Sequence, residues 1–197
     1  MKQVITISRE FGSGGRTIGR MVAERLGYAF YDEELVNEVA KRSGFSPEFI
    51  KESGEYATSR HSLLFSLATA QQFSVEGLST MDRLYIEQTK IIEELGAKGD
   101  CVIVGRCADF ILKEEPKAFH VFIYGNEEDK ARRIVELYGE KESSPAKRLQ
   151  EKDQRRKVYY KNYTGRTWGQ MQNYDLCLNS SVIGVDTCVD LILAAIK

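Results

Sequence analysis

Short apolar runs alternate with longer amphipathic stretches along the chain. Five runs rich in β-branched or aromatic residues are typical of buried parallel strands. Between them, hydrophobic residues recur at helical spacing. Strands that alternate with helices predict an α/β domain with three αβα layers and a mostly five-stranded parallel sheet. The expected strands are Val4–Ile7, Ala29–Tyr31, Cys101–Val104, Ala118–Tyr124 and Tyr174–Leu178.

The expected helices have recognisable starts and stops, such as serine, aspartate or asparagine caps and terminal glycines. Residues 54–78 contain no proline and carry an apolar patch, so a helix is expected there too. The other expected helices are Thr17–Leu26, one from Asp32 to Gly44, a short one from Ser46-Pro47, Ser79–Leu95, Asn126–Tyr138, Ser144 to about Tyr163, and Asp186–Lys197.

Composition narrows the class of protein. The 197 residues, 42% of them hydrophobic, suffice for one domain with a full core. The formal net charge of -1 gives no overall basic field for duplex DNA or anionic lipid, so anion binding requires a local cluster. No segment approaches the roughly 20 apolar residues of a membrane span, and no signal peptide is recognisable. The four cysteines form no C-x-x-C pair, so reduced thiols in a cytoplasmic protein are expected.

A glycine-rich segment directly follows the first expected strand. Three glycines fall within four positions, at Gly12, Gly14 and Gly15, and Arg16-Thr17 then opens an amphipathic helix. A phosphate is bound by exposed backbone N–H groups at a helix N-terminus, and glycine permits the backbone path that this requires. The alternative is a plain glycine turn. The pattern favours a nucleotide phosphate held by Gly12, Ser13, Gly14, Gly15, Arg16 and Thr17.

Several segments resemble the cytidylate kinase-like proteins, relatives of bacterial cytidylate kinase among the P-loop nucleoside monophosphate kinases. They are ITISREFGSGGRTIGRMVAERLGYAFYDEEL, VIVGRCADFIL, HVFIYGNEEDKARRI, KDQRRKVYYKNYTGRTW and YDLCLNSS. The resemblance implies one P-loop NTPase-type domain over residues 1–197. It also implies a helical acceptor-binding insertion at 32–96, a basic lid at 140–170, and ATP on the loop with Mg²⁺ near Thr17.

The chain departs from this family pattern in the glycine loop and at the end of the third strand. The usual loop reads G-x-x-x-x-G-K-G-T. With Gly12-Ser13-Gly14 aligned, Arg9 replaces its first glycine and Gly15 replaces the lysine that serves the transferring phosphates. With Gly15-Arg16-Thr17 aligned instead, Arg16 takes the place of the lysine and Glu10 that of the first glycine, so neither register contains the lysine. Either Arg16 or Arg9 is a candidate to supply the missing charge. The Asp-Gly-Arg that follows the third strand in cytidylate kinases reads Val104-Gly105-Arg106 here, and Asp32 is a candidate replacement carboxylate or simply a helix N-cap.

Basic residues supply the expected phosphate clamps. Arg106 follows a buried strand at the carboxyl edge of the sheet, where ligands of such sheets bind. The resemblance gives it a monophosphate partner, with Asp109 nearby, and the alternative is a salt bridge to Asp109. Asp32, Arg106 and Asp109 are therefore the expected acceptor-site residues.

Residues 145–166 carry eight basic and two acidic side chains, a local excess of six positive charges. The resemblance makes this segment a lid that closes over phosphates, with Arg155 and Arg156 as its clamps. Because adjacent arginines repel each other, we expect the lid to be mobile until an anion binds. The alternative is a solvated helix face.

The sequence favours an ATP-dependent phosphotransferase with Arg16, Arg106, Arg155 and Arg156 as catalytic residues. Its acceptor is expected to be cytidine monophosphate by family default, or another small molecule. Asn179 and Ser180 follow the last strand and are expected to line the ATP base, unless they form a simple turn. A non-catalytic nucleotide-binding protein is the main alternative. A third is an RNA-binding module that stacks bases on Tyr159, Tyr160, Tyr163 or Trp168. No nucleic acid or membrane partner is expected, and the oligomeric state is left open.

Overall fold

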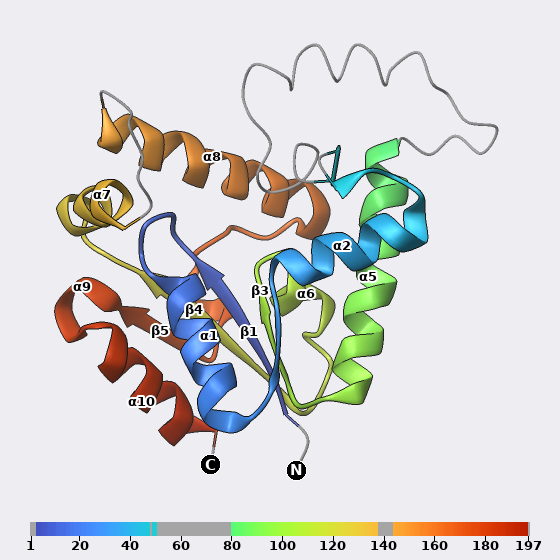
Figure 1. Cartoon of the computed structure of the whole chain (residues 1–197), viewed down its shortest axis with the longest axis horizontal. Helices are drawn as coiled ribbons and strands as arrows, with labels where there is room; N and C mark the ends of the chain where they lie inside the picture. Colours follow the sequence, from blue (N-terminus) through green and yellow to red (C-terminus); the bar gives the residue numbers. More distant parts are fainter. Residues whose placement is uncertain (1–2, 48, 51–79, 138–143, 197) are drawn as a thin grey trace.

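The computed structural model describes residues 3–47, 49–50, 80–137 and 144–196. Five parallel strands form one sheet in the order β2-β3-β1-β4-β5, as Figure 1 shows. The strands are β1 (Val4–Arg9), β2 (Ala29–Tyr31), β3 (Cys101–Val104), β4 (Ala118–Tyr124) and β5 (Leu176–Asn179). The predicted sheet is confirmed. β1 is two residues longer than expected, and β5 begins at Leu176 instead of Tyr174.

The helices follow the strands in the expected alternation. They are α1 (Gly15–Leu26), α2 (Glu33–Ser43), α5 (Thr80–Lys98), α6 (Ala108–Ile111), α7 (Glu127–Glu136), α8 (Pro145–Thr164), α9 (Ser180–Ile183) and α10 (Val185–Ala195), with a 3-10 turn at Met171–Asn173. Ser46 Oγ accepts the N–H of Phe49 at 3.2 Å, as its predicted capping role requires. The helix expected within 54–78 lies outside the described residues.

Two hydrophobic clusters cover the two faces of the sheet. On one face, α1 and α10 pack Ile18, Val22 and Ile192 against strand residues such as Ile5. On the other face, a second buried cluster is built from α2, α5, α6 and the side chains of β1 and β3 that point to that face. Strands that bury both faces need apolar residues at successive positions, which explains the continuous runs in the sequence. The three-layer arrangement is therefore confirmed.

The carboxyl ends of the parallel strands meet at one edge of the sheet. Figure 1 shows α8 crossing over this edge, with α7 beside it. The β1–α1 loop and the β3–α6 turn both lie at this edge because each begins where its strand ends. These connections therefore occupy the part of the fold where ligands of open α/β sheets bind.

All four cysteines are free thiols, and three of them are buried. Within the part of the chain that the structure describes, no helix is long and apolar enough to cross a membrane.

Candidate functional site

The glycine-rich loop between β1 and α1 takes a path that only glycine adopts without strain. Gly12 and Gly14 have φ angles of 78° and 80°. A Cβ added to Gly12 would lie 2.9 Å from the carbonyl oxygen of Lys130, on α7. Gly12 is therefore required both by its backbone conformation and by the close approach of α7.

Side chains from distant elements hold the carbonyl groups of this loop. Each of four loop carbonyls accepts a hydrogen bond from an arginine or a serine, and three of the donors come from α7, α8 and α9. The pairs are Arg156 Nη1 to Arg9 O at 3.1 Å, Arg133 Nη1 to Gly12 O at 2.7 Å, Ser180 Oγ to Ser13 O at 2.6 Å, and Ser13 Oγ to Glu10 O at 2.8 Å. The loop's acceptors are therefore directed at the protein.

The amide groups that follow are left for a ligand. The first N–H groups of a helix have no intrahelical acceptor, and α1 begins at Gly15. Among the described residues, the hydrogen bonds include no acceptor for the N–H of Gly14, Gly15 or Thr17. Together with the positive end of the helix dipole, these amides make the start of α1 a candidate anion-binding site.

Glu10 fixes the flank of the loop. Its carboxylate accepts a salt bridge from Lys130 Nζ at 2.6 Å and the N–H of Gly125 at 3.3 Å. Lys130 is buried, so this ion pair joins α7 firmly to the loop. Because Glu10 and Lys130 neutralise each other, neither charge is expected to be the main group that binds a ligand.

The basic helix α8 docks directly on the loop through Asp153. Asp153 Oδ1 accepts the N–H of Phe11 at 2.7 Å and pairs with Arg156 Nη1 at 3.1 Å. Burial raises the pKa of Asp153, and the Arg156 charge and the Phe11 N–H oppose that rise. The expected repulsion between Arg155 and Arg156 is therefore relieved inside the protein, because Asp153 balances Arg156. Asp153 thus holds Arg156 in place without an added anion, and the mobility of the lid stays a prediction.

Arg155 lies on the outer side of α8, and its role as a clamp stays a prediction. It is partly exposed, and desolvation lowers its pKa, with Arg148 adding to the decrease and Glu151 opposing it. Arg156, by contrast, is buried between α8 and the loop. The two adjacent arginines therefore differ in burial: Arg156 is buried, and Arg155 is partly exposed.

The β3–α6 turn places three successive residues in the left-handed region. The φ angles of Gly105, Arg106 and Cys107 are 72°, 60° and 57°. Left-handed backbone costs a non-glycine residue roughly 1–2 kcal/mol, so two such residues in succession are maintained by their surroundings. Gln88 contributes by donating to the carbonyl of Arg106 at 3.1 Å.

Asp109 supports this turn from below. Its Oδ1 accepts from Ser8 Oγ at 3.1 Å, and its Oδ2 accepts from Tyr160 Oη at 2.6 Å. Burial raises the pKa of Asp109, opposed by these two hydrogen bonds. The salt bridge to Arg106 considered from sequence is not formed. Asp109 instead links β1 and α8 beneath the turn.

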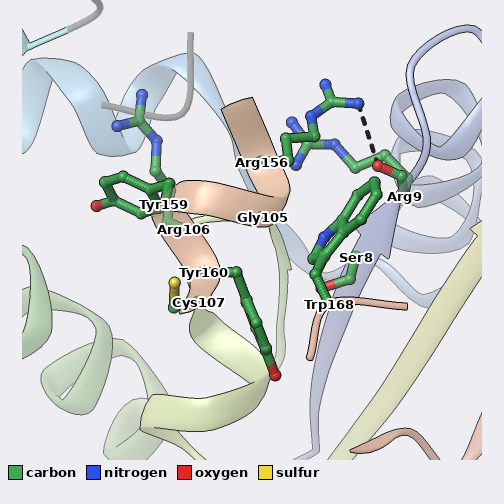
Figure 2. Close-up of a pocket in the computed structure, with 9 residues that line it drawn as sticks. All are labelled: Ser8, Arg9, Gly105, Arg106, Cys107, Arg156, Tyr159, Tyr160 and Trp168. Atoms are coloured by element: carbon green, nitrogen blue, oxygen red, sulfur yellow. Dashed lines mark hydrogen bonds between the residues drawn. The ribbon is translucent and has the colours of Figure 1, made fainter. Parts of the chain in front are cut away.

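These elements enclose a narrow pocket at the carboxyl edge of the sheet. Figure 2 shows three arginines, two tyrosines and a tryptophan around it. Its lining consists of Ser8, Arg9, Gly105, Arg106, Cys107, Arg156, Tyr159, Tyr160 and Trp168. Arg9, Arg106 and Arg156 are all buried, so the pocket concentrates positive charge where solvent screens little of it. Arg106 and Arg156 therefore line the same pocket, together with Arg9, and their role as phosphate clamps stays a prediction.

Arg16 and Asp32 form an ion pair beside the loop. Arg16 Nε lies 2.5 Å from Asp32 Oδ2, with the arginine side chain 48% exposed and the aspartate 5% exposed. Asp32 occupies the N-cap position of α2 but makes no capping hydrogen bond with its side chain. Thr17 lies exposed in the first turn of α1. Asp32 is therefore oriented toward the loop and α1 instead of toward its own helix.

Asn179 and Ser180 lie where β5 ends, next to the loop. Asn179 Oδ1 caps α9 by accepting the N–H of Ser181 at 3.0 Å. The Ser180 hydroxyl contacts the carbonyls of Ser13 and Tyr124. The structure thus gives both residues local roles, and contact with an ATP base stays a prediction for them.

The aromatic residues of α8 pack against other rings. Tyr85 and Tyr163 stack with centroids 4.0 Å apart, and Trp168 meets Phe122 edge-on at 5.3 Å. Tyr159 Oη accepts from Gln88 Nε2 at 3.4 Å. Intramolecular packing therefore accounts for these rings, which the RNA-binding alternative would have used as a stacking surface.

A glycine-rich loop between β1 and α1, beside an arginine-lined pocket on a parallel sheet, is the arrangement of a kinase-like P-loop domain. The chain belongs to the cytidylate kinase-like family, whose family model matches residues 4–182. No curated protein matches the chain.

Solved structures agree with this assignment of the fold. An uncharacterized protein from Eubacterium ventriosum is 28% identical, with a TM-score of 0.73 and coverage of 99% of this chain and 98% of that one. Shikimate kinase from Acinetobacter baumannii is 16% identical, with a TM-score of 0.56 over 100% and 93% of the two chains. A gluconokinase from Sinorhizobium meliloti is 16% identical, with a TM-score of 0.57 over 99% and 91%. The latter two likenesses are of fold alone.

Proposed function

We propose that this protein is an ATP-dependent phosphotransferase that moves the γ-phosphoryl group of ATP to a nucleoside monophosphate, CMP or dCMP by family default, or to another small acceptor. One observation carries the proposal. The loop's carbonyls are held by the protein while its helix-start amides remain available, directly beside a pocket lined by three buried arginines. Phosphoryl transfer depends on this combination of positioning and charge neutralisation.

In the proposed reaction, an acceptor oxygen bonds to the γ-phosphorus as the bond from that phosphorus to the β,γ-bridging oxygen breaks, which releases ADP. A monophosphate dianion carries no proton that must be removed. The loop amides hold the phosphates of ATP, and Arg106 and Arg156 neutralise the transferring group. Arg155 and Arg16 stand at the margin of the site and are proposed to close on bound ligand.

The residues present fit Mg²⁺ held jointly with a nucleotide. The described residues include no cluster of three or more His, Cys, Asp or Glu side chains able to form a metal cage. Mg²⁺ with nucleotides is commonly held by one or two protein oxygens, water and the phosphates. The exposed Thr17 hydroxyl at the start of α1 is the proposed protein ligand, and the ion would supply charge neutralisation there.

The acceptor is proposed to bind between Arg106 and residues 32–60. Of this segment, residues 48 and 51–60 lie outside the described residues. Asp32, with its carboxylate beside Arg16, is the proposed acceptor-side carboxylate. Both Asp109 oxygens are occupied by Ser8 and Tyr160, so we propose that it positions the site. ATP and the reducing conditions that suit four free thiols are both cytoplasmic, and we place the enzyme there.

A coupled ADP-release assay tests the proposal. The purified chain is given MgATP with CMP, dCMP, UMP, AMP or GMP, and separately with shikimate and gluconate as hydroxyl acceptors. We expect acceptor-dependent ADP release for at least one nucleoside monophosphate. Arg106→Met should abolish it, while Arg25→Met, which alters an exposed ion pair at the far end of α1, should not. Release only with a hydroxyl acceptor would contradict the monophosphate assignment.

One observation favours a non-catalytic nucleotide-binding protein as the second candidate. The loop has no lysine, and Gly15, at the aligned position, has no room for a side chain. This alternative predicts that MgATP raises the melting temperature without ADP release for any acceptor. Both the phosphotransferase and the non-catalytic alternative are therefore expected to bind MgATP, and only the phosphotransferase is expected to release ADP.

A further inference from the structure

The missing lysine of the loop has a structural counterpart in Arg9. A Cβ placed on Gly15, the first residue of α1, would lie 2.5 Å from Arg9 Cβ and 2.9 Å from Arg9 Cγ. Separations under 3.0 Å are essentially never adopted by real Cβ atoms. The Arg9 side chain therefore fills the space through which a side chain at position 15 would leave the backbone.

Arg9 is fixed in this place by its neighbours. It is the last residue of β1, it is 5% exposed, and its carbonyl accepts from Arg156 Nη1 at 3.1 Å. Figure 2 shows its side chain running from the end of β1 toward α8, among the residues that line the arginine pocket. Its backbone is therefore anchored by the strand on one side and by α8 on the other.

The alternative candidate for the lysine's role has different surroundings. Arg16 is 48% exposed and is engaged by Asp32 at 2.5 Å. Arg9, in contrast, shares its pocket with Arg106 and Arg156. Three buried arginines among the residues that line one narrow pocket favour an anion nearby, because burial strengthens both their mutual repulsion and their attraction to negative charge.

We propose that Arg9 carries the phosphate-neutralising role of the P-loop lysine, relocated from the start of α1 to the end of β1, and that Gly15 is glycine because Arg9 occupies its side-chain space. The inference rests on the proposed function. A guanidinium presents a planar fork of donors, so Arg9 is suited to contact two phosphate oxygens at once, where a lysine offers one compact charge.

The first test removes the charge of Arg9 and retains its stem. Arg9→Met should lower kcat by roughly 100-fold or more, as loss of a transition-state donor does, with a smaller change in ATP affinity. Arg9→Lys should retain more of the turnover than Arg9→Met. Arg25→Met is the matched control on the surface. A merely structural role would leave the kcat of folded Arg9→Met unchanged or would lower Arg9→Met and Arg9→Lys alike.

The second test exchanges the two side chains. Gly15→Lys alone should lose both melting temperature and turnover because the new side chain meets Arg9. The double variant Arg9→Gly with Gly15→Lys recreates G-x-x-x-x-G-K, and it should recover at least tenfold in turnover over Arg9→Gly alone. The melting temperature also reports the steric part of the proposal, since the loss caused by Gly15→Ala should shrink in an Arg9→Gly background.

Binding of inorganic pyrophosphate and MgATP, measured by calorimetry, tests the role of Arg9 separately from the proposed function. If the parent protein binds both and turns over while Arg9→Met matches it in kcat and in pyrophosphate affinity, the assignment of Arg9 is overturned and the proposed function stands. If the parent protein binds neither compound, the proposed function fails, and the assignment of Arg9 fails with it. A tenfold or greater loss of pyrophosphate affinity in Arg9→Met, together with the lowered kcat, supports the assignment.

Discussion

The β1–α1 loop and the β3–α6 turn both follow a buried parallel strand at the same edge of the sheet, but they use the left-handed backbone differently. In the first, the left-handed positions are the glycines Gly12 and Gly14. In the second, Gly105 is followed by two non-glycine residues with positive φ, Arg106 and Cys107. A loop that presents amides needs no side chains, whereas a turn that presents an arginine must tolerate one in a strained conformation.

The hydrogen bonds that support the β1–α1 loop and the β3–α6 turn also differ. Hydrogen bonds from Arg133, Arg156 and Ser180 hold the carbonyls of the loop, so its backbone is what the protein shapes. The turn is supported through side chains, by Gln88 on its carbonyl and by the buried Asp109 next to it. The loop therefore provides a fixed backbone, and the turn provides a fixed backbone position from which the Arg106 side chain leaves.

The largest effect is expected when the glycine of the loop acquires a side chain. Gly12→Ala should lower the free energy of unfolding by about 3 kcal/mol, because left-handed strain adds to the clash with Lys130. Gly27→Ala is the matched control, since Gly27 also has positive φ but nothing lies within 4 Å of its added Cβ, and it should cost about 1 kcal/mol. Urea denaturation measures both. Equal losses at the two positions would show that the approach of α7 contributes nothing.

A smaller loss is expected when one carbonyl support is removed. Ser180→Ala deletes the hydroxyl that contacts Ser13 O and Tyr124 O, which should lower the free energy of unfolding by about 1–2 kcal/mol and weaken pyrophosphate binding. The neighbouring Ser181 hydroxyl accepts the N–H of Asn126 instead of contacting the loop. Ser181→Ala should therefore leave pyrophosphate affinity unaltered in titration calorimetry. If both variants bind pyrophosphate as the parent does, the carbonyl supports do not shape the anion site.

The strain in the second turn is isolated by comparing two variants at Arg106. Arg106→Ala and Arg106→Gly both remove the guanidinium, so both should abolish turnover. Only glycine relieves the positive φ, and after its greater freedom in the unfolded chain is subtracted, Arg106→Gly should be more stable than Arg106→Ala by about 1 kcal/mol. Chemical denaturation of the pair gives this difference directly. An alanine variant as stable as the glycine variant means that the turn relaxes once the arginine is gone.

The smallest and most gradual effect concerns pH, because the second turn is supported by a titratable group. Burial raises the pKa of Asp109, so the folded protein binds its proton at a higher pH than the unfolded chain does. Stability from this group is present below the ordinary aspartate pKa of about 3.9 and is lost as pH rises from there through the raised pKa. Asp109→Asn should therefore flatten the fall in unfolding free energy over that interval.

Tyr160→Phe provides the opposite control for the pH series. The Tyr160 hydroxyl donates to Asp109 Oδ2 and favours the charged carboxylate, so its removal should raise the pKa of Asp109 further and steepen the fall. Urea denaturation across the pH range compares the three proteins. A slope that is identical in parent and Asp109→Asn assigns the pH dependence to other groups, such as Asp153, whose pKa burial also raises.

Local pattern was sufficient to predict the five strands and the place of the glycine-rich loop in the fold. β-Branched runs mark the strands because a sheet covered on both faces needs apolar residues throughout, and the glycine spacing marks the loop because only glycine adopts its φ angles. The boundaries that were missed have local causes. β5 begins at Leu176, because the N–H of Tyr174 bonds to Met171 O within a turn and the Asp175 carboxylate accepts the N–H of His120 in β4.

The contacts within the site were beyond local pattern, because they join residues far apart in the chain. Asp153 was counted only as one of two acidic residues in a basic segment, yet it accepts the N–H of Phe11, 142 positions away. Asp32 was considered a helix cap, but the nearby Arg16 provides a charged partner that a capping N–H cannot match. The exclusion between Arg9 and Gly15 depends on how closely β1 approaches the start of α1, which neither residue reveals alone.

The long separations within the loop's supports also set an order of events during synthesis. The donors to Gly12 O, Arg9 O and Ser13 O lie 121, 147 and 167 positions further along the chain. At 5–20 residues per second, a ribosome needs roughly 6–33 seconds to add that length after the loop has been made. Throughout this interval the loop's carbonyls lack these partners. The binding site matures only with the last strand and the serine that follows it.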